Sequence, residues 1–375
     1  MRFRPWLLVP LALAVSLGGI LAACRVRQPR AEPVANTAPP AVATVAPPTV
    51  GDTLRQAAER RQRKVGVALA TWFFDNPAYP ELSAREFDSL TPENEMKWYQ
   101  VEPQPGQFDW KPGDRLVAFA KEHGMRMRGH TLVWHNQLAP WVNGLSGDAL
   151  RSAMLKHVTA TAEHFKGQIA QWDVVNEAVG DQGEPRPNSP FTALGPGYIA
   201  EAFRAAHAAD PGALLFYNDY EIEDLSWPKS QGVFRLVKEL KESGVPIHGI
   251  GLQTHVDPRR WPTAEVIQKT LEHFAELGLF IELTEIDVPV GEIAGTLEQK
   301  LAAQKELTRG IVRACLAVKL CTGMTFWGLT DRHSWLSTPE WAPTRGKGPH
   351  LPLPFDENYR PKPMRAGILE ALTAP

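Results

Sequence analysis

Two glutamates stand at points where an apolar stretch of the chain gives way to polar residues. In the segment QWDVVNEAV the apolar run ends at Asn176 and Glu177, and in the segment IELTEIDV it ends at Glu285. Asp287 follows Glu285 by two residues and therefore lies on the same face of an extended strand. Runs that are apolar on both faces are typical of buried strands in a parallel sheet, which deliver side chains at their open ends. A single Glu after a strand is more often the start of a helix, so neither residue is decisive alone.

As a pair, the two glutamates predict acid and nucleophile chemistry. Two strands that each present one carboxyl group would place Glu177 and Glu285 on one rim of a barrel. Hydrolysis of a glycosidic bond needs such a pair, with one protonated acid for the leaving oxygen and one ionised nucleophile or base.

The elements that would position these carboxylates alternate regularly along the chain. After a short polar helix at 52–62, candidate strands lie at 65–70, 86–92, 126–134, 170–177, 213–219, 247–255, 280–288 and 324–331. Amphipathic stretches typical of helices lie at 113–123, 148–165, 197–209, 230–243, 264–277 and 297–318. This alternation predicts a parallel sheet, and eight strands predict an α/β fold of the closed (β/α)₈ type, the TIM barrel.

Polar and aromatic residues recur where these strands end. They are Glu93, Asn94 and Lys97; His130, Trp134 and Gln137; Asn218, Asp219 and Tyr220; Gln253, Thr254 and His255; and Trp327, Asp331 and Trp335. Each could be a core residue by itself, but the carboxyl ends of barrel strands face one pocket. Indole faces suit the C–H faces of sugar rings, and charged and amide groups can bond to sugar hydroxyls. Trp98 is a further candidate for this pocket, whereas Trp172 lies inside a strand and should belong to the core.

The N-terminal segment is expected to direct export and not to join the fold. Arg2 and Arg4 precede an apolar run, which is followed by the letters LAAC ending at Cys24. This pattern predicts a lipoprotein signal peptide over residues 1–23, with lipid on Cys24. An ordinary secretory peptide is the alternative. A membrane helix is disfavoured, because the apolar run is short for a span of about 20 residues. Residues 24–50 are rich in Pro and Ala and predict a semi-extended tether. Residues 51–375 would form one barrel domain, anchored at the cell envelope on the outer membrane or cell surface.

Charge and cysteine content argue against several other classes of function. The 375 residues carry a formal net charge of −2, and nothing in their pattern suggests binding to nucleic acid. Apart from Cys24, only Cys315 and Cys321 are present, and in an exported chain we favour a disulfide between them over two buried thiols. Two cysteines without further ligands argue against a zinc site, and we expect neither a metal nor a cofactor.

With these stretches assembled, the chain from about residue 51 to its end resembles the family 10 glycoside hydrolases, which are mostly endo-β-1,4-xylanases. The motifs FDSLTPENEMKW, RGHTLVWH, WDVVNEA, YNDY, GIGLQTH, TEIDV and FWGLTDRHSW occur in the family's order. The resemblance implies a (β/α)₈ barrel that hydrolyses xylan and xylo-oligosaccharides with retention of anomeric configuration. We expect the enzyme to be a monomer.

The resemblance also implies roles for individual residues. Glu177 would be the acid/base and Glu285 the nucleophile. His255 and Asp287 would hold the nucleophile, and Asn176 would bond to the sugar's 2-hydroxyl. The pKa of Glu177 should be raised while the nucleophile is anionic and should fall once it becomes an ester. The residues that match the family's glycone-side subsites are Glu93, Asn94, Lys97, His130, Trp134, Gln137, Gln253, Trp327 and Trp335.

Two features depart from the family's pattern. Glu221 stands where relatives commonly have Asn, and we interpret it as a surface substitution that adds a carboxylate near the aglycone side. The segment 336–353 after the last strand is longer than usual, and Leu336 stands where many relatives have Arg, so we expect a partly closed cleft.

Two alternative functions stay open at this point. Some relatives cleave β-1,4-glucans as cellobiosidases, and the residues that meet the sugar's C5 position, with Gln137 and Trp335 as candidates, would decide between glucose and xylose. The other alternative is a surface lipoprotein that captures oligosaccharides without cleaving them, although both glutamates are retained.

Overall fold

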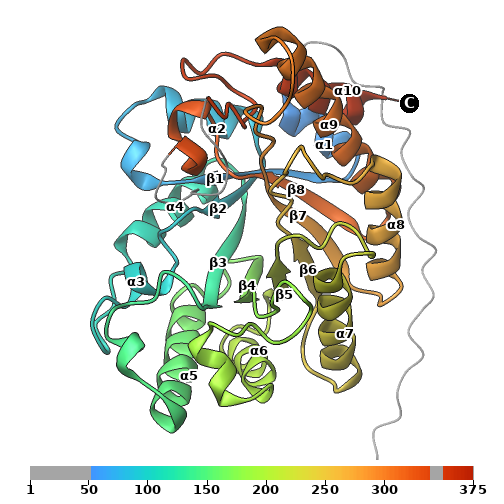
Figure 1. Ribbon diagram of the computed structural model, residues 1–375. Coiled ribbons are helices and arrows are strands. Elements are labelled where there is room, and N and C mark those ends of the chain that lie inside the picture. The colour runs from blue at the N-terminus through green and yellow to red at the C-terminus, as the bar shows by residue number, and fades with distance from the viewer. Residues whose placement is uncertain (1–51, 338–348, 375) are drawn as a thin grey trace, which may run out of the picture. The chain divides into compact units, whose positions relative to one another are not determined.

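The computed structural model describes residues 52–337 and 349–374, and its strands close into one parallel barrel (Figure 1). The strands follow one another around the barrel in sequence order: β1 (Lys64–Leu69), β2 (Ser89–Pro92), β3 (Arg126–Trp134), β4 (Gln171–Asn176), β5 (Leu214–Asp219), β6 (Gly249–Leu252), β7 (Phe280–Ile286) and β8 (Cys321–Phe326). Pairing of β8 with β1, which sets Gly323 opposite Lys64, closes the circle. The predicted (β/α)₈ fold is therefore confirmed.

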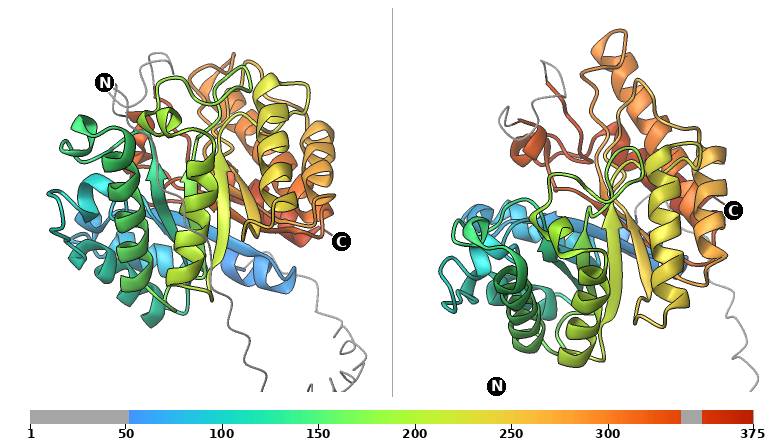
Figure 2. Two further views of the ribbon diagram at one scale, coloured as in Figure 1. Left: turned by 90° about the horizontal axis from the view of Figure 1, so that it is seen from below. Right: turned by 60° about the horizontal axis from the view of Figure 1, so that its bottom comes forward.

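The helices lie outside the strands, as both views in Figure 2 show. They are α1 (Leu54–Arg60), α2 (Ala78–Glu86), α3 (Trp98–Val101), α4 (Lys111–Glu122), α5 (Gly147–His164), α6 (Gly197–Ala209), α7 (Pro228–Glu242), α8 (Ala264–Ala275), α9 (Leu297–Ala317) and α10 (Pro363–Thr373). Helix α10 packs against α9 and α1, which in turn contact β8 and β1. The C-terminal segment thereby joins the helices that pack on the two strands where the barrel closes.

The predicted strands are all present, and their limits differ most from the prediction in three of them. β2 begins at Ser89, because Glu86 still belongs to α2, where its carboxylate accepts hydrogen bonds from Arg365. β6 is shorter than the predicted 247–255, and β8 ends before the predicted 324–331 does. In β6 and β8 the polar residues of the motifs GIGLQTH and FWGLTDRHSW lie beyond the end of the strand, in the loops that form the site.

The six predicted amphipathic stretches form α4 to α9, and the short helix at 52–62 forms α1. Three helices were not predicted from the sequence. Pro80 interrupts the amphipathic pattern of α2, α3 is only one turn long, and α10 follows a Pro-rich segment. Short or Pro-containing helices give a weak periodic signal, and their stability comes from tertiary packing.

The interior of the barrel is polar, and its charged side chains pair across it. Arg126 of β3 donates to both carboxylate oxygens of Glu282 on β7, at 2.8 and 3.0 Å. Gln171 of β4 donates to the same carboxylate at 3.0 Å, and Arg128 forms a two-pronged ion pair with Asp173. Because β3 and β7 are not neighbours in the barrel, a bond between them must cross its interior. These side chains therefore occupy a space that branched apolar residues fill in most barrels of this kind.

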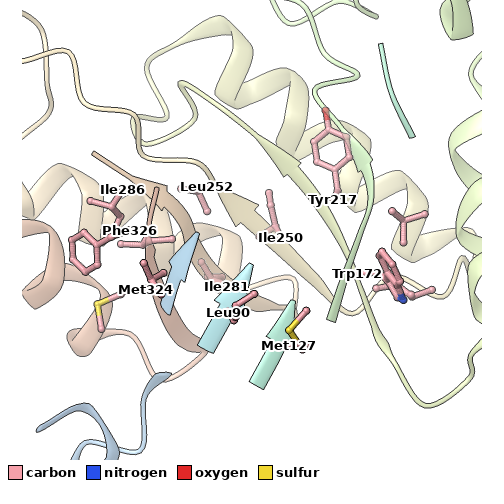
Figure 3. Close-up of a cluster of buried hydrophobic side chains, with 14 of the residues drawn as sticks. Leu90, Met127, Trp172, Tyr217, Ile250, Leu252, Ile281, Ile286, Met324 and Phe326 are labelled. Carbon is pink, nitrogen blue, oxygen red and sulfur yellow. The ribbon is translucent and has the colours of Figure 1, made fainter. Parts of the chain in front are cut away.

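The apolar core lies between the strands and the helices. Successive side chains of a strand point to opposite faces, so Met127 and Trp172 point outward where their charged neighbours point inward. Figure 3 draws part of this layer, with side chains from β2 to β8. Trp172 is fully buried, as predicted, and its ring lies so close to Gly129 that a Cβ there would stand 2.3 Å from it.

Three predictions concern segments other than the barrel strands. Cys315 in α9 and Cys321 at the start of β8 form the predicted disulfide, with their Cα atoms 5.3 Å apart. Within the described ranges, none of the helices is both long and apolar enough to cross a membrane. The predicted signal peptide and tether, Cys24 included, and residues 338–348 of the predicted long loop lie outside the described residues.

Gly129→Ala is expected to destabilise the barrel, because the added methyl would overlap the indole of Trp172, which is itself fixed by the core. We expect the free energy of unfolding to fall by about 1–3 kcal/mol. Gly144→Ala is the matched control, since a Cβ at that exposed position meets nothing within 4 Å, and it should change the stability by less than about 0.5 kcal/mol. Chemical denaturation of both variants measures this. Equal stability of the two would contradict the close contact.

Candidate active site

A cavity of about 540 Å³ opens at the carboxyl ends of the strands. The residues predicted from the sequence that line it are Glu93, Asn94, Lys97, His130, Trp134, Gln137, Asn176, Glu177, Tyr220, Gln253, His255, Glu285, Trp327 and Trp335. Asp287 is fully buried and lies behind His255. The structure therefore brings together side chains from all parts of the barrel, as expected from the way parallel strands end on one face.

Glu285, at the end of β7, has a partner on each carboxylate oxygen. Asn218 Nδ2 donates to Oε1 at 2.8 Å, and His255 Nε2 lies 3.1 Å from Oε2. The other ring nitrogen of His255 lies 2.8 Å from Asp287 Oδ2, which also accepts a hydrogen bond from Trp335 Nε1 at 2.8 Å. The predicted support of Glu285 by His255 and Asp287 is thus present in the structure, and Asn218 adds a contact that was not predicted.

These contacts favour the ionised form of Glu285. Burial alone would raise the pKa of this carboxyl, but the hydrogen bond from His255 and the neighbouring His130 bring the pKa below its ordinary value. Burial would likewise lower the pKa of His255, but the carboxylates of Asp287 and Glu285 raise it to about 10. His255 is therefore a cation at neutral pH, and both of its ring nitrogens donate to carboxylates.

Glu177, the residue after β4, has a left-handed backbone with φ of 56°. Its N–H donates to Asn218 O at 2.9 Å, and its Oε1 accepts from Gln253 Nε2 at 2.9 Å. Burial pushes the pKa of Glu177 upward, but the hydrogen bond from Gln253 and the neighbouring His135 bring it below its ordinary value. The raised pKa predicted for Glu177 is therefore not found in this structure.

His135 was not predicted to belong to the site. Burial, together with Arg186 and Lys229, lowers the pKa of this imidazole to about 4, although Glu177 opposes the shift. His135 is therefore neutral at neutral pH and cannot then act on Glu177 as a cation. Near neutral pH the low pKa of Glu177 therefore rests on the hydrogen bonds from Gln253 and Trp134 and on the charge of Lys229.

A chain of amides connects the two carboxylates. Asn218, which donates to Glu285, also donates to Asn176 Oδ1 at 2.9 Å, and Gln253 Nε2, which donates to Glu177, lies 3.3 Å from the same oxygen. The reversed amide of Asn176 would accept from Trp134 Nε1 at 3.3 Å and donate to the backbone oxygen of Asn218 at 3.2 Å, but it would set its nitrogen against the amide nitrogens of Asn218 and Gln253. We therefore favour the orientation in which Asn176 Oδ1 faces the amide nitrogens of Asn218 and Gln253.

Several backbone positions around the pocket are left-handed without being glycine. Gln137, Glu177, Glu221 and Thr254 have φ between 47° and 64°, a conformation that costs free energy for these residue types. Thr254 N–H donates to Glu223 Oε1 at 2.8 Å, and burial raises the pKa of Glu223 to about 7. Thr254 stands between Gln253 and His255, so this contact helps to place both. Glu223 was missed because a lone Glu in a loop has no distinctive pattern.

One end of the pocket is formed around a buried lysine. Lys97 Nζ donates to Gln137 Oε1 at 2.7 Å and lies 5.0 Å from the ring centre of Trp134 and 5.9 Å from that of Trp327. Burial raises the pKa of Glu93 to about 7, although Lys97 opposes the shift. Amide, ammonium, carboxyl and indole groups thus meet at this end, as the sequence predicts for a sugar site.

Two interpretations of single residues need correction. Trp98 does not line the pocket; it is buried in α3 and stacks on His157 with ring centres 4.1 Å apart. Glu221 lines the pocket and forms an ion pair with Arg260, so it is part of the pocket wall and not a bland surface substitution. Pocket residues missed by sequence reasoning include Trp72, Phe73, Tyr99, Asn136, His333 and Ser334. Tyr99 lies in α3, whereas Trp72, Phe73 and His333 lie in short 3₁₀ turns, and none of these turns has a distinctive sequence pattern. Asn136 and Ser334 lie in the loops after β3 and β8.

Within residues 52–337 and 349–374 there is no cluster of three or more His, Cys, Asp or Glu side chains suited to hold a metal ion. The arrangement that remains is a pair of carboxylates, the buried Glu285 supported by a cationic imidazole and the half-buried Glu177, beside aromatic and amide groups. Such a pair can protonate a leaving oxygen and attack a sugar carbon.

Comparison with known proteins gives one consistent picture. The sequence profile of glycosyl hydrolase family 10 matches residues 53–371. The chain is 41% identical over 326 residues to endo-1,4-beta-xylanase B of Thermotoga neapolitana, covering 85% of this chain and 91% of that protein. It is 40% identical to endo-1,4-beta-xylanase A of Humicola insolens over 304 residues, which are 79% of this chain and 78% of the relative.

Solved structures agree with the sequence relatives. Native xylanase 10B of Thermotoga maritima superposes with a TM-score of 0.79 at 41% identity, covering 85% of this chain and 98% of that one. Xylanase 10B of Thermotoga petrophila, solved in complex with xylobiose, gives the same TM-score of 0.79 and identity of 41%, over 85% of this chain and 97% of that one.

His255→Gln is expected to raise the pKa of Glu285. The variant replaces a hydrogen bond from a cation by a weaker one from a neutral amide, so the proton binds to Glu285 more readily. As the pH falls, Glu285 should then lose its charge at a higher pH than in the wild type. Carbon-13 NMR titration of protein labelled at glutamate carboxyls measures this, with the signal identified by its loss in Glu285→Gln. His164→Gln, at a half-buried histidine of α5 that pairs with Asp114 and does not line the cavity, is the control and should leave the titration unchanged. An unshifted titration in His255→Gln would contradict the proposed support.

Proposed function

The chain belongs to glycosyl hydrolase family 10, and from that premise we propose that it hydrolyses internal β-1,4 bonds of xylan with retention of configuration. The xylanases it resembles over more than three quarters of its length support this substrate, as does the relative solved with xylobiose. The observation that carries the proposal is the placement of Glu177 and Glu285 in one pocket, joined by the amide chain of Asn218, Asn176 and Gln253.

In the first step of the proposed mechanism, Glu285 attacks the anomeric carbon and Glu177 protonates the departing oxygen. The low pKa of Glu285 keeps the nucleophile ionised, and Asn218 and His255 fix the direction of its two oxygens. The bond from carbon to the leaving oxygen breaks as the ester to Glu285 forms. The proton of Glu177 goes to the leaving hydroxyl.

Glu177 must carry a proton for this step, although its pKa is low in the ligand-free protein. We propose that bound xylan raises that pKa in two ways. A sugar excludes water from the carboxyl, which adds to the burial that favours the protonated form, and its hydroxyls compete for the amide of Gln253. After the ester has formed, Glu177 is ionised again and takes a proton from the water that releases the sugar.

The residues at the Lys97 end of the pocket are proposed to hold the sugars on the glycone side. Glu93, Asn94 and Gln137 offer hydrogen-bonding groups, and Trp134, Trp327 and Trp335 offer indole surface. Asn176, whose Nδ2 donates to Glu177 Oε1 at 3.3 Å, is proposed to donate to the 2-hydroxyl of the sugar at the cleaved bond, as the family resemblance implies.

Glu285→Ala is expected to abolish hydrolysis of xylan, with kcat/KM lower by about 10³-fold or more, because no other group in the pocket takes the nucleophile's place. Glu177→Ala should lose xylan hydrolysis as well, but it should still form the ester from an aryl xylobioside whose leaving group needs no proton. Added azide should then restore turnover of that substrate. Reducing-end assays and stopped-flow release of the aryl group measure these effects.

Glu239→Ala is the matched control, since this exposed glutamate lies on α7, outside the pocket, and should keep full activity. In the wild type, proton NMR should show the β anomer as the first product. An α anomer as the first product, or unchanged activity of Glu285→Ala, would contradict the mechanism.

Substrate choice is tested by comparing arabinoxylan, linear xylo-oligosaccharides and cello-oligosaccharides with the same protein. Turnover of cello-oligosaccharides alone would favour a β-1,4-glucanase, with Gln137 and Trp335 as the residues to exchange. Binding of xylo-oligosaccharides without turnover would favour a capture protein. We expect xylan and xylo-oligosaccharides to be cleaved.

We further propose that the protein is exported and held at the cell envelope by lipid on Cys24, with residues 24–50 as the tether. In a bacterial host the wild-type protein is expected in the membrane fraction and in the detergent phase of a Triton X-114 separation. Cys24→Ser should move it out of both, because the thiol that accepts the lipid is gone. Val34→Ser, a control in the tether, should not. A wild-type protein found wholly in the aqueous phase would contradict the anchor.

A further inference from the structure

A tryptophan at the mouth of the pocket has no role in the mechanism described above. Trp72 lies in a short 3₁₀ turn, η1 (Thr71–Phe73), that follows β1, and it lines the same cavity as Glu285. Its relative exposure is 51%, and the other large apolar side chains that are exposed in the described residues, Phe280 and Leu297, do not line the cavity. An exposed indole at the rim of a sugar pocket is apolar surface that a ligand can cover.

The turn that carries Trp72 is held on one side by the carboxylate of Glu95. Thr71 N–H and Thr71 Oγ1 both donate to Glu95 Oε1, at 2.5 and 2.9 Å, and Thr71 is buried. The second oxygen of Glu95 accepts from Asn94 N–H at 3.2 Å. One buried carboxylate therefore ties the turn of Trp72 directly to the backbone of a proposed glycone-side residue.

The other side of the turn is held by stacked rings. Phe73 stacks on His333, from the loop after β8, with ring centres 3.8 Å apart, and meets Tyr79 edge-on at 5.5 Å. His333 Nε2 lies 3.2 Å from the hydroxyl of Tyr359, which also accepts from Asn76 Nδ2 at 3.1 Å. Because both neighbours of Trp72 are held in this way, its backbone is fixed while its indole faces the cavity and solvent. Because its backbone is already fixed, only the side-chain rotation of Trp72 is restricted when a ligand binds, which limits the entropy lost.

We infer that Trp72 forms a stacking platform for a further xylose unit on the glycone side, beyond the sugars that Glu93 and Asn94 contact. The inference rests on the proposed function and extends its binding site. Trp72 follows β1, next to β2 and the β8 loop, whereas Tyr220 and Glu221 line the opposite end after β5. A polymer that passes between the two carboxylates and leaves over Glu93 and Asn94 reaches Trp72 next.

The chemistry of the ligand matches this surface. A xylopyranose ring carries hydrogen and no hydroxymethyl at C5, so it can lie flat on an indole, with its C–H bonds against the ring and its hydroxyls in water. Such a contact adds affinity only for a glycone chain long enough to reach it. The enzyme should therefore prefer substrates that extend on the glycone side by at least one xylose beyond the sugars that Glu93 and Asn94 contact.

Aryl xylosides of increasing length test this, because the aryl group occupies the aglycone side and every added xylose extends the glycone side. We would measure kcat/KM of the full chain with 4-nitrophenyl xylobioside, xylotrioside and xylotetraoside, for the wild type, Trp72→Ala and Trp72→Phe. In the wild type, kcat/KM should rise with length. In Trp72→Ala the gain should be smaller by about three- to tenfold, with the xylobioside unaffected, and Trp72→Phe should keep part of the gain.

Phe280→Ala is the matched control, since it removes an exposed aromatic side chain of 37% exposure that does not line the cavity, and it should keep the wild-type gain. An equal gain with length in Trp72→Ala and wild type would overturn the inference. An equal loss on all three substrates would also overturn it, by showing that Trp72 supports the pocket or is covered by another segment of the chain. If no variant cleaves any xyloside, including the wild type, the proposed function fails first, so the two failures are distinguishable.

Discussion

A carboxylate that has to stay ionised while it is nearly fully buried sets the main constraint on this structure. Burial alone would keep a proton on Glu285 and remove its nucleophilic character. The hydrogen bond from His255 and the neighbouring His130 offset that effect, while Asn218 holds the other oxygen. His255 is a cation because the carboxylates of Asp287 and Glu285 both face it. These groups come from β3, β5, β6 and β7 and the residues that follow them. Their mutual dependence explains why the site needs the closed barrel: no single segment of the chain brings together the partners that Glu285 requires.

Glu177 has the opposite requirement to Glu285, because it has to carry a proton, and its surroundings in this structure do not favour the protonated form. An acid has to be protonated when the substrate is bound, yet Gln253 lowers the pKa of Glu177 in the ligand-free protein. The proposed solution is that the substrate itself changes the surroundings of Glu177. Binding of xylan would then contribute to protonating Glu177. For a sugar that fills the pocket poorly, Glu177 would carry a proton less often, and the leaving oxygen would be protonated more slowly. The platform proposed at Trp72 would act on the same step, because it holds the polymer in the pocket from outside the reacting bond.

The floor beneath the pocket is built from charges and not from branched apolar side chains. Arg126 and Arg128 meet Glu282 and Asp173 inside the barrel, and Asp173 Oδ2 lies 2.9 Å from His130 Nδ1, which lines the pocket above. Buried ion pairs add little net stability, because the cost of taking charges out of water offsets their attraction. Breaking one of them is costly, however, since the remaining charge would be buried without a partner. The network therefore fixes the relative positions of β3, β4 and β7 more than it stabilises the fold.

The sequence by itself determined the fold and most of the residues that form the site. Alternating strand and helix patterns predict the barrel, and strand ends such as those at Asn176 and Glu285 mark the residues that its geometry then collects in one pocket. Only the tertiary structure decided how these residues act on one another. The contact of Asn218 with Glu285, the support of Thr254 by Glu223, the burial of Trp98 and the exposure of Trp72 all depend on segments far apart in the chain. The low pKa of Glu177 has the same origin, because a pKa depends on burial and on neighbours in space, and neither can be read from the order of residues along the chain.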